Sequence, residues 1–480
     1  MSPESTRFPT ALTALPADFV FGAATASYQI EGAYDEDGRG PSIWDTYCRE
    51  PGRVADGATG DVACDHYHRY PEDVALLRGL GVHSYRFSIA WPRVQPTGEG
   101  PANARGLDFY DRLVDELLAA GVSPAATLYH WDLPQALEDR GGWRVRETAE
   151  RFAEYAALTA ERLADRVPRW ITLNEPFCSA FVGHAIGGHA PGTREGAGAL
   201  AAAHHLLVGH GLAVRALRAA GAGQVGITLN PDRLLPATEA PADHAAVRRA
   251  ETLHNEVWLD PLFAGRYPRD ETGTWGGLAD GPWRLDGDLE RIAAPLDFTG
   301  INYYRPITVT DAPYRDPDPA TRTAADIRVE QVARDGVRHT TMGWPVMPHT
   351  FTDLLVDLSR RYPALPPLYI TENGSAEADT VAPDGHVHDA DRVDYLRDHL
   401  TALAGAIAAG VDVRGYYVWS LLDNFEWARG YGQRFGLVRV DYDTQERLPK
   451  DSYHWYRGLI AAHREHHAQQ AQHTGEQADR

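Results

Sequence analysis

Short apolar runs recur along the chain, and each is followed by a longer stretch in which apolar residues return every three to four positions. Residues 125–129 show the first type, because they are apolar without alternation, as a strand buried on both faces should be. The pattern predicts eight strands, at residues 18–30, 84–91, 123–131, 170–174, 224–230, 297–304, 368–372 and 413–420.

The stretches between these strands are typical of amphipathic helices. Residues 107–120 have apolar side chains at helical spacing, and a glycine follows as a stop. The apolar positions are Leu107, Tyr110, Leu113, Val114, Leu117 and Leu118. Residues 147–164 and 389–409 behave similarly. Eight strand–helix alternations predict an α/β fold, a single closed (β/α)8 TIM barrel, and the count of eight disfavours a doubly wound open sheet.

Two segments do not follow this alternation of strands and helices. Residues 305–341 are rich in Pro, Asp, Arg and Thr and predict one long loop after the sixth strand. The end of the chain, from about residue 463, is polar and without periodicity, which predicts a frayed tail. We therefore expect an N-terminal extension at 1–17, a catalytic barrel at 18–463 with elaborated loops at its C-terminal face, and a polar tail at 464–480.

Net charge and cysteine content limit the kinds of partner and the cellular compartment that we expect for this protein. The 46 Lys and Arg against 67 Asp and Glu give a net charge of −21, which disfavours nucleic acid and anionic membranes as partners. An anionic substrate would need a local basic pocket. Three cysteines in 480 residues do not make a disulfide scaffold, and neither a signal peptide nor a run of about 18 apolar residues is visible. We expect a soluble cytoplasmic protein, with a homo-oligomer left open.

Catalytic residues of a barrel come from the C-terminal ends of its strands and the loops that follow. At those positions the chain has two carboxylates, on strands four and seven, among amides, aromatic rings and one arginine. In chain order these residues are Gln29, Arg86, His130, Trp131, Asn174, Glu175, Asn230, Asn302, Tyr304, Glu372, Asn373, Trp419, Glu426 and Trp427.

This set suits the cleavage of a glycosidic bond. The transition state resembles an oxocarbenium ion, which needs one carboxylate beside the anomeric carbon and one protonated carboxyl beside the leaving oxygen. Arg86 and Tyr304 would stabilise Glu372 as the charged partner, and that charge would raise the pKa of Glu175. Whether the enzyme is retaining or inverting depends on the carboxyl separation, which a sequence does not give.

Seven motifs resemble glycoside hydrolase family 1, the β-glucosidases. FGAATASYQIEG at residues 21–32 resembles its N-terminal signature, TLNEP at 172–176 its acid/base motif, and YITENG at 369–374 its nucleophile motif. RFS at 86–88, YHW at 129–131, GINYY at 300–304 and DNFEW at 423–427 occur in the same order. The resemblance runs from about residue 18 to 463.

The resemblance implies a retaining β-glucosidase that cleaves small O-glycosides, such as cellobiose or aryl β-glucosides, with no metal or organic cofactor. It implies Glu372 as nucleophile and Glu175 as acid/base, supported by Arg86, Tyr304 and Asn302. The implied substrate-binding residues are Gln29, His130, Trp131, Asn174, Trp344, Trp419, Glu426 and Trp427. Phe177 stands where many relatives have Trp, which leaves the aglycone preference open.

Two branches of that family are disfavoured. Phosphoglycosidases replace the Glu of the Phe-Glu-Trp motif and add a lysine, but Glu426 is present here and Lys450 is the only lysine in the chain. Thioglucosidases have Gln in place of the acid, which is Glu175 here. An unphosphorylated O-glycoside is therefore expected.

Other interpretations have less support. The lysine count disfavours a Schiff-base aldolase, and Gly221-X-Gly223-X-X-Gly226 precedes a strand, the reverse of the dinucleotide-binding order. A non-catalytic sugar-binding barrel should have lost one carboxylate, whereas glycosyl transfer to other acceptors remains open. Cys178 is expected only to pack beside the acid loop, and Phe435 is as compatible with the core as with sugar contact.

Overall fold

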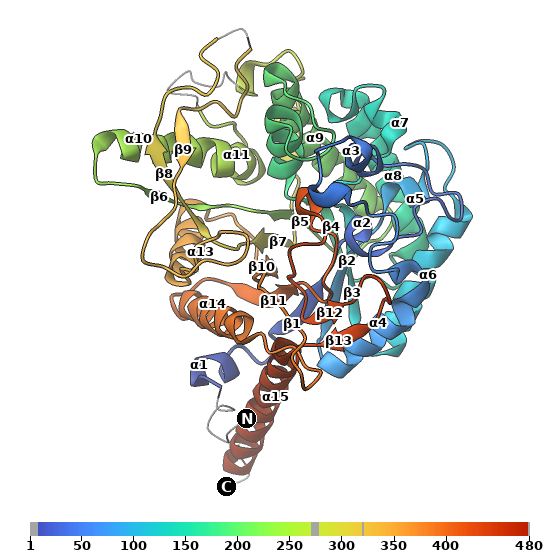
Figure 1. Cartoon of the computed structure of the whole chain (residues 1–480), viewed down its shortest axis with the longest axis vertical. Coiled ribbons are helices and arrows are strands. Elements are labelled where there is room, and N and C mark those ends of the chain that lie inside the picture. Colours follow the sequence, from blue (N-terminus) through green and yellow to red (C-terminus); the bar gives the residue numbers. More distant parts are fainter. Residues whose placement is uncertain (1–7, 270–277, 319–320, 479–480) are drawn as a thin grey trace.

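The computed structural model describes residues 8–269, 278–318 and 321–478. Eight parallel strands close into a barrel in the order β1-β11-β10-β7-β5-β4-β3-β2, which confirms the predicted TIM-barrel class (Figure 1). The barrel strands are β1 (Val20–Ala24), β2 (Ser84–Ser88), β3 (Ser123–Tyr129), β4 (Arg169–Asn174), β5 (Gln224–Leu229), β7 (Phe298–Asn302), β10 (Leu368–Asn373) and β11 (Val413–Trp419).

Helices surround this barrel, as the alternating pattern predicts (Figure 1). The longer ones are α4 (His66–Leu80), α6 (Ala104–Ala119), α8 (Arg146–Leu163), α9 (Gly196–Ala219), α10 (Pro241–Glu251), α13 (His349–Arg361), α14 (Ala390–Ala408) and α15 (Asp451–Ala478). The shorter α-helices are α1 (Thr10–Thr13), α2 (Ser27–Ile30), α3 (Ile43–Arg49), α5 (Trp91–Val94), α7 (Gln135–Glu138), α11 (Val257–Phe263) and α12 (Asp288–Ile292). Single turns and π-helical segments are η2 (Ala55–Gly57), η3 (Gly142–Arg144), η4 (Cys178–Ile186), η5 (Thr252–Glu256), η6 (Leu278–Asp280) and η7 (Trp427–Arg429).

Burial explains why these strands and helices form. Strands β2 and β10 are buried at every position, so both of their faces pack against other layers of the protein. Helix α6 buries Leu113 and Leu117 on its apolar face, but Leu118, which the spacing placed on the same face, is 43% exposed. Helix α9 is long and apolar enough to cross a membrane by length and composition, yet 83% of its most apolar window is buried in the protein.

The first predicted strand was too long. Strand β1 ends at Ala24, and the chain then turns into helix α2, which contains Gln29. Gln29 therefore approaches the barrel mouth from a short helix and not from a strand end. Strand β2 similarly ends at Ser88, before Trp91 begins helix α5.

The long loop predicted at 305–341 contains regular structure. Strands β8 (Pro306–Asp311) and β9 (Val329–Gln331) join β6 (Arg233–Pro236) in a separate three-stranded sheet. This sheet lies beside α10, away from the barrel axis (Figure 1). A further pair, β12 (Val438–Val440) and β13 (Arg447–Pro449), follows the last barrel strand. The alternation of Ile307 and Val309, both buried, is the local signal that the loop interpretation missed.

The polar end of the chain is helical and not frayed, because α15 continues to Ala478. Its first half is anchored by Tyr456 and Leu459, which are fully buried, and Nε2 of His467 donates to the carbonyl of Leu15 at 2.7 Å. Regular structure can then propagate from an anchored helix into a polar sequence. In Figure 1 this helix points away from the barrel, next to α1. The division into extension, barrel and tail stays a prediction.

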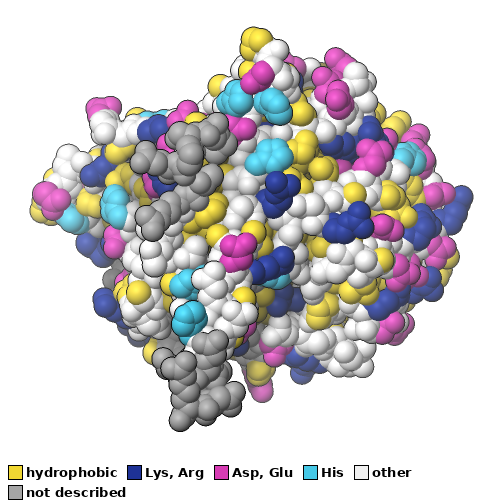
Figure 2. Space-filling model, turned by 90° about the horizontal axis from the view of Figure 1, so that it is seen from below, with side chains coloured by type: hydrophobic (Ala, Val, Ile, Leu, Met, Phe, Trp, Pro, Cys, Tyr) yellow, Lys and Arg dark blue, Asp and Glu magenta, His cyan; other side chains and the backbone are white. Residues whose placement is uncertain are grey.

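Charged side chains of both signs are interspersed on the face in Figure 2, with apolar side chains scattered among them. The net charge of −21 is therefore not concentrated in one acidic patch on that face.

Candidate active site

Glu372 lies near the end of β10 and is held by two donors. The Arg86 guanidinium on β2 donates to Oε1 at 2.5 Å, and the Tyr304 hydroxyl donates to Oε2 at 2.6 Å. Strand β10 has a register irregularity against β7 between Ile370 and Glu372, and such bulges re-aim side chains beside active sites. Both carboxylate oxygens are thus fixed, one of them by a cation.

Glu175 follows the end of β4 and has neutral partners only. The Asn302 amide donates to its Oε1 at 2.7 Å, and the Cys178 thiol donates to its Oε2 at 3.2 Å. Burial, and next the nearby charge of Glu372, raise the pKa of Glu175 to about 8. This carboxyl group therefore keeps its proton at neutral pH.

Asn174 connects the two carboxyl groups. Its Oδ1 accepts from Arg86 at 2.6 Å and from Asn302 at 3.0 Å, while its amide lies 3.1 Å from Nε2 of His130. Asn302 is fixed in turn, since its Oδ1 accepts from the Thr371 hydroxyl at 2.8 Å. One hydrogen-bonded chain therefore sets the positions of both carboxyl groups, and Asn174 retains a second amide N–H for a ligand.

Gln29 and Glu426 form a second polar group. Gln29 Nε2 lies 3.5 Å from Glu426 Oε2 and donates to the carbonyl of Phe425 at 2.9 Å, while its Oε1 is buried without a hydrogen-bond partner in the described chain. Burial first, and then the charges of Glu372 and Glu175, raise the pKa of Glu426 to about 8. An unpaired acceptor next to a buried carboxyl group suits a ligand with several hydroxyls.

Aromatic rings surround these polar groups. His130 stacks near Trp419 and Trp427, with ring centroids 5.9 Å apart in both cases. Burial lowers the pKa of His130 well below its usual value, so the imidazole is neutral. Trp131 lies 4.5 Å from Trp427, but its indole N–H already donates to the carbonyl of Asn174 at 2.9 Å. Trp131 therefore offers a ring face to a ligand and no free donor.

Three residues of this region have left-handed backbone angles, which are uncommon outside glycine. The φ values are 78° for Trp131, 45° for Glu175 and 47° for Trp427. Such strained conformations persist where the surrounding structure enforces them, and they cluster at functional sites.

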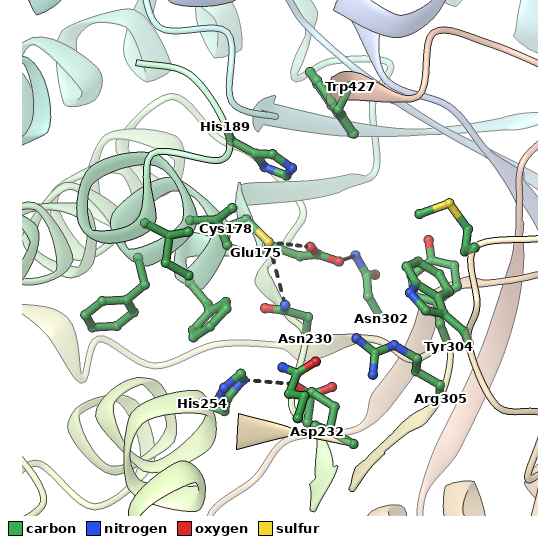
Figure 3. Close-up of a pocket in the computed structure, with 18 of the residues that line it drawn as sticks. Glu175, Cys178, His189, Asn230, Asp232, His254, Asn302, Tyr304, Arg305 and Trp427 are labelled. Atoms are coloured by element: carbon green, nitrogen blue, oxygen red, sulfur yellow. Dashed lines mark hydrogen bonds and ion pairs between the residues drawn. The ribbon is translucent and has the colours of Figure 1, made fainter. Parts of the chain in front are cut away.

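A single cavity of about 450 Å³ collects most of the predicted residues. Figure 3 shows Glu175, Asn302, Tyr304 and Trp427 around it. The predicted residues that line it are His130, Trp131, Glu175, Asn302, Tyr304, Trp344, Glu372, Trp419, Glu426 and Trp427. Arg86, Asn174 and Gln29 are not among the residues that line it, but each contacts one that does: Arg86 contacts Glu372, Asn174 contacts Asn302, and Gln29 contacts Glu426. Phe435 lines it as well, with its ring 6.0 Å from that of Trp344.

Some cavity residues were not anticipated from the sequence. Cys178 was expected only to pack, yet its thiol contacts the carboxyl group of Glu175. Arg305, Asp232 and His254 line the outer part of the cavity, with Asp232 and His254 joined at 2.9 Å (Figure 3). Two features of the sequence could have indicated these residues. Cys178 comes one helical turn after Glu175, and Arg305 directly follows Tyr304. Within the described residues, no three His, Cys, Asp or Glu side chains are grouped so that they could hold a metal ion.

Known proteins resemble this chain over nearly its whole length. The sequence model of glycosyl hydrolase family 1 matches residues 12–465. A thermostable β-glucosidase B from Thermobispora bispora is 51% identical over 451 residues, covering 93% of this chain and 90% of that protein. A bifunctional β-D-glucosidase/β-D-fucosidase from Bifidobacterium breve is 48% identical, covering 93% and 98%.

Solved structures agree with these sequence matches. The psychrophilic β-glucosidase from Micrococcus antarcticus superposes with a TM-score of 0.90 at 49% identity, covering 96% of this chain and 100% of that one. The family 1 β-glucosidase from Thermotoga maritima in complex with isofagomine lactam gives a TM-score of 0.88 at 45% identity, covering 94% and 99%.

Proposed function

The chain belongs to glycosyl hydrolase family 1 and is a glycosidase, and we propose that it hydrolyses terminal β-D-glucosyl residues of small unphosphorylated O-glycosides with retention of configuration. Glu372 acts as nucleophile and Glu175 as acid/base. The observation that carries this assignment is the contrast between their partners: a cation and a phenol on Glu372, neutral donors alone on Glu175.

In the first step a carboxylate oxygen of Glu372 attacks the anomeric carbon and forms an ester. The bond from that carbon to the leaving oxygen breaks, its electron pair goes to the oxygen, and Glu175 donates its proton there. The raised pKa of Glu175, about 8, keeps this proton available at neutral pH.

In the second step the charge that raised the pKa of Glu175 is absent, because Glu372 is now an ester. The pKa of Glu175 falls, so its carboxylate can accept a proton from the water that attacks the anomeric carbon. Asn302 and Cys178 both donate to the carboxylate form and stabilise Glu175 in this state. The ester bond then breaks and Glu372 regains its charge.

Glu426 and Gln29 support an unphosphorylated sugar as the bound unit. A carboxyl group at the sugar-binding end disfavours a phosphate on the same sugar. The only lysine, Lys450, is fully buried between Asp379 and Asp423, with Nζ 2.7 Å from Asp423 Oδ1, and it does not line the cavity. Trp344 and Trp419 would pack the apolar faces of substrate, such as cellobiose or an aryl β-glucoside. The three free thiols support a reducing compartment, the cytoplasm.

Proton NMR of a phenyl β-D-glucoside digest tests the stereochemistry. We expect β-glucose to appear first and α-glucose only later by mutarotation. Glu372→Gly should lose nearly all turnover and regain part of it with azide, giving α-glucosyl azide. First-formed α-glucose, or a Glu372→Gly variant with normal turnover, would contradict the proposal. Asp353→Gly on the exterior helix α13 is a control without a cavity contact.

A further inference from the structure

The outer part of the cavity combines apolar walls with a guanidinium group. One wall comes from η4 and its neighbours, and the other from the three-stranded sheet that lies outside the barrel. The apolar lining includes Phe177, Phe181 and Ile186 on the first side, and Ile307, Val309 and Val329 on the second. Arg305 also lines the cavity, directly after Tyr304 in the chain.

Arg305 makes no hydrogen bond or ion pair with any described residue. Its guanidinium carbon lies 5.4 Å from the ring centroid of Trp344, a cation–π contact that leaves the N–H groups free. Figure 3 shows the guanidinium directed toward the middle of the pocket, between Asn302 and Asp232. Burial lowers the pKa of Arg305, and the nearby charge of Asp232 offsets this effect only in part.

Some buried arginines of this chain have carboxylate partners. Arg93 pairs with Glu31 at 3.0 Å, and Arg249 pairs with Asp311 at 2.5 Å. The charge of Asp232 acts on Arg305, but the carboxylate makes its hydrogen bond with His254 and none with the guanidinium. A desolvated guanidinium with five free donors is costly unless something else occupies them.

The rim of the cavity also has arginine side chains without a bonded partner within the described chain. Arg315 and Arg429 line it, both are exposed, and neither side chain forms a hydrogen bond or ion pair with the part of the chain that the structure describes. The outer cavity therefore has an excess of positive charge, with Arg305, Arg315 and Arg429 against Asp232, although the whole protein carries −21. This is the local basic pocket that an anionic group would need.

We propose that the outer cavity selects glucosides whose aglycone has an aromatic or apolar body and carries a carboxylate that Arg305 binds. Phenolic-acid β-glucosides have this chemistry. The body of the aglycone packs between the two apolar walls, and the carboxylate accepts hydrogen bonds from the guanidinium. This inference rests on the proposed function, since the sugar of the same molecule must reach Glu175 and Glu372.

The test compares 3- and 4-carboxyphenyl β-D-glucosides with the corresponding carbamoylphenyl glucosides, at pH 6.5. The ratio of kcat/KM between each acid and its amide is measured for wild type and for Arg305→Met. The acid and amide phenols differ as leaving groups, but this difference is the same for both enzymes. It therefore cancels when the two acid-to-amide ratios are compared. We expect the preference for at least one acid to fall about tenfold in Arg305→Met, mainly through KM, and to be partly kept in Arg305→Lys.

Arg360→Met is the matched control, because Arg360 is an exposed arginine on helix α13 outside the cavity and its loss changes the net charge equally. Its acid-to-amide ratio should equal that of wild type. A second measurement does not depend on turnover: 4-hydroxybenzoate should inhibit wild type more strongly than 4-hydroxybenzamide, and the difference should vanish in Arg305→Met.

An acid-to-amide ratio that Arg305→Met leaves unchanged for both isomers overturns the inference. So does an equal fall in Arg360→Met, which would show a general field effect. In either case hydrolysis of the neutral amides by wild type would leave the proposed function standing. If wild type cleaved none of the four glucosides, the proposed function and the inference would fail together.

Discussion

The contact between Cys178 and Glu175 predicts how the pKa of the proposed acid/base group can be changed. Burial raises the pKa of the Cys178 thiol well above its usual value, so the thiol remains a donor throughout the working pH range. A donor to the charged form of a carboxyl group lowers its pKa. The thiol therefore holds the pKa of Glu175 below the value that burial and Glu372 alone would give.

Cys178→Ala removes this donor, and Cys178→Ser replaces it with a stronger one of nearly the same size as alanine. A thiol is a weak donor, so we take about 0.5–1 kcal/mol for its bond to the carboxylate. At 1.36 kcal/mol per pH unit this is a change of about 0.4–0.7 in the pKa of Glu175. Because the acid must be protonated, the basic limb of the pH profile should move up in Cys178→Ala and down in Cys178→Ser.

The assay is kcat/KM for phenyl β-D-glucoside between pH 5 and 9.5, measured as glucose release. Phenol is a poor leaving group, so this substrate requires the proton of Glu175. Both variants lose the sulfur atom, so any effect of looser packing should have one sign in both. Shifts in the same direction, or no shift in either variant, would refute the assignment of Cys178 as a donor to the acid/base group.

Two predictions concern stability. Glu426 has its pKa raised to about 8, so the folded state binds a proton that the unfolded state releases near pH 4.5, and this contribution to stability is lost as the pH rises from about 4.5 to 8. Glu426→Gln should therefore lose less stability than wild type between pH 5 and 9 in urea unfolding, by about 1–3 kcal/mol; an identical pH dependence would contradict the buried titration. Lys450→Met removes the cation that Asp379 and Asp423 share, while Arg392 still pairs with Asp379 and Arg434 with Asp423, so the free energy of unfolding should fall by about 2–3 kcal/mol. Arg414→Met, which breaks an exposed pair with Asp412, should cost at most about 1 kcal/mol, and equal effects would refute the role of burial.

The barrel was predictable because its strands are buried on both faces. Continuous apolar runs such as β3 and β11 stand out from the helical spacing around them, and their number fixes the architecture. Strand β8 was missed because its partner β6 lies about seventy residues earlier, and a local pattern does not identify a distant partner. The helical end of α15 was missed for a related reason, since its anchor is Leu15 at the other end of the chain.

The sequence predicted which residues meet in the inner site better than it predicted the hydrogen bonds between them. Strand ends of a barrel converge at one mouth, so the positions of Glu175, Glu372 and Tyr304 in sequence indicated a shared pocket. The sequence did not predict which atoms form hydrogen bonds with one another in the site. Trp131 could have offered its indole N–H to a sugar, but the carbonyl of Asn174 accepts it. The Arg305 guanidinium has no hydrogen-bond partner among the described residues, whereas Asp232 is bound to His254. Only the folded structure shows this pairing.

The assignment of roles in the site follows from partner chemistry more than from any single pKa. Three carboxyl groups, Glu175, Glu372 and Glu426, share one buried cavity, and among the described side chains Arg86 alone donates to one of them as a cation. Three charges beside one another with a single compensating cation are unfavourable in a desolvated space, so protons must occupy the groups that lack the cation. Arg86 is bound to Glu372, which leaves the proton to Glu175 and Glu426. Exchanging the two proposed roles would thus require the Arg86 guanidinium to bind Glu175 in place of Glu372, but its other arm already donates to Asn174.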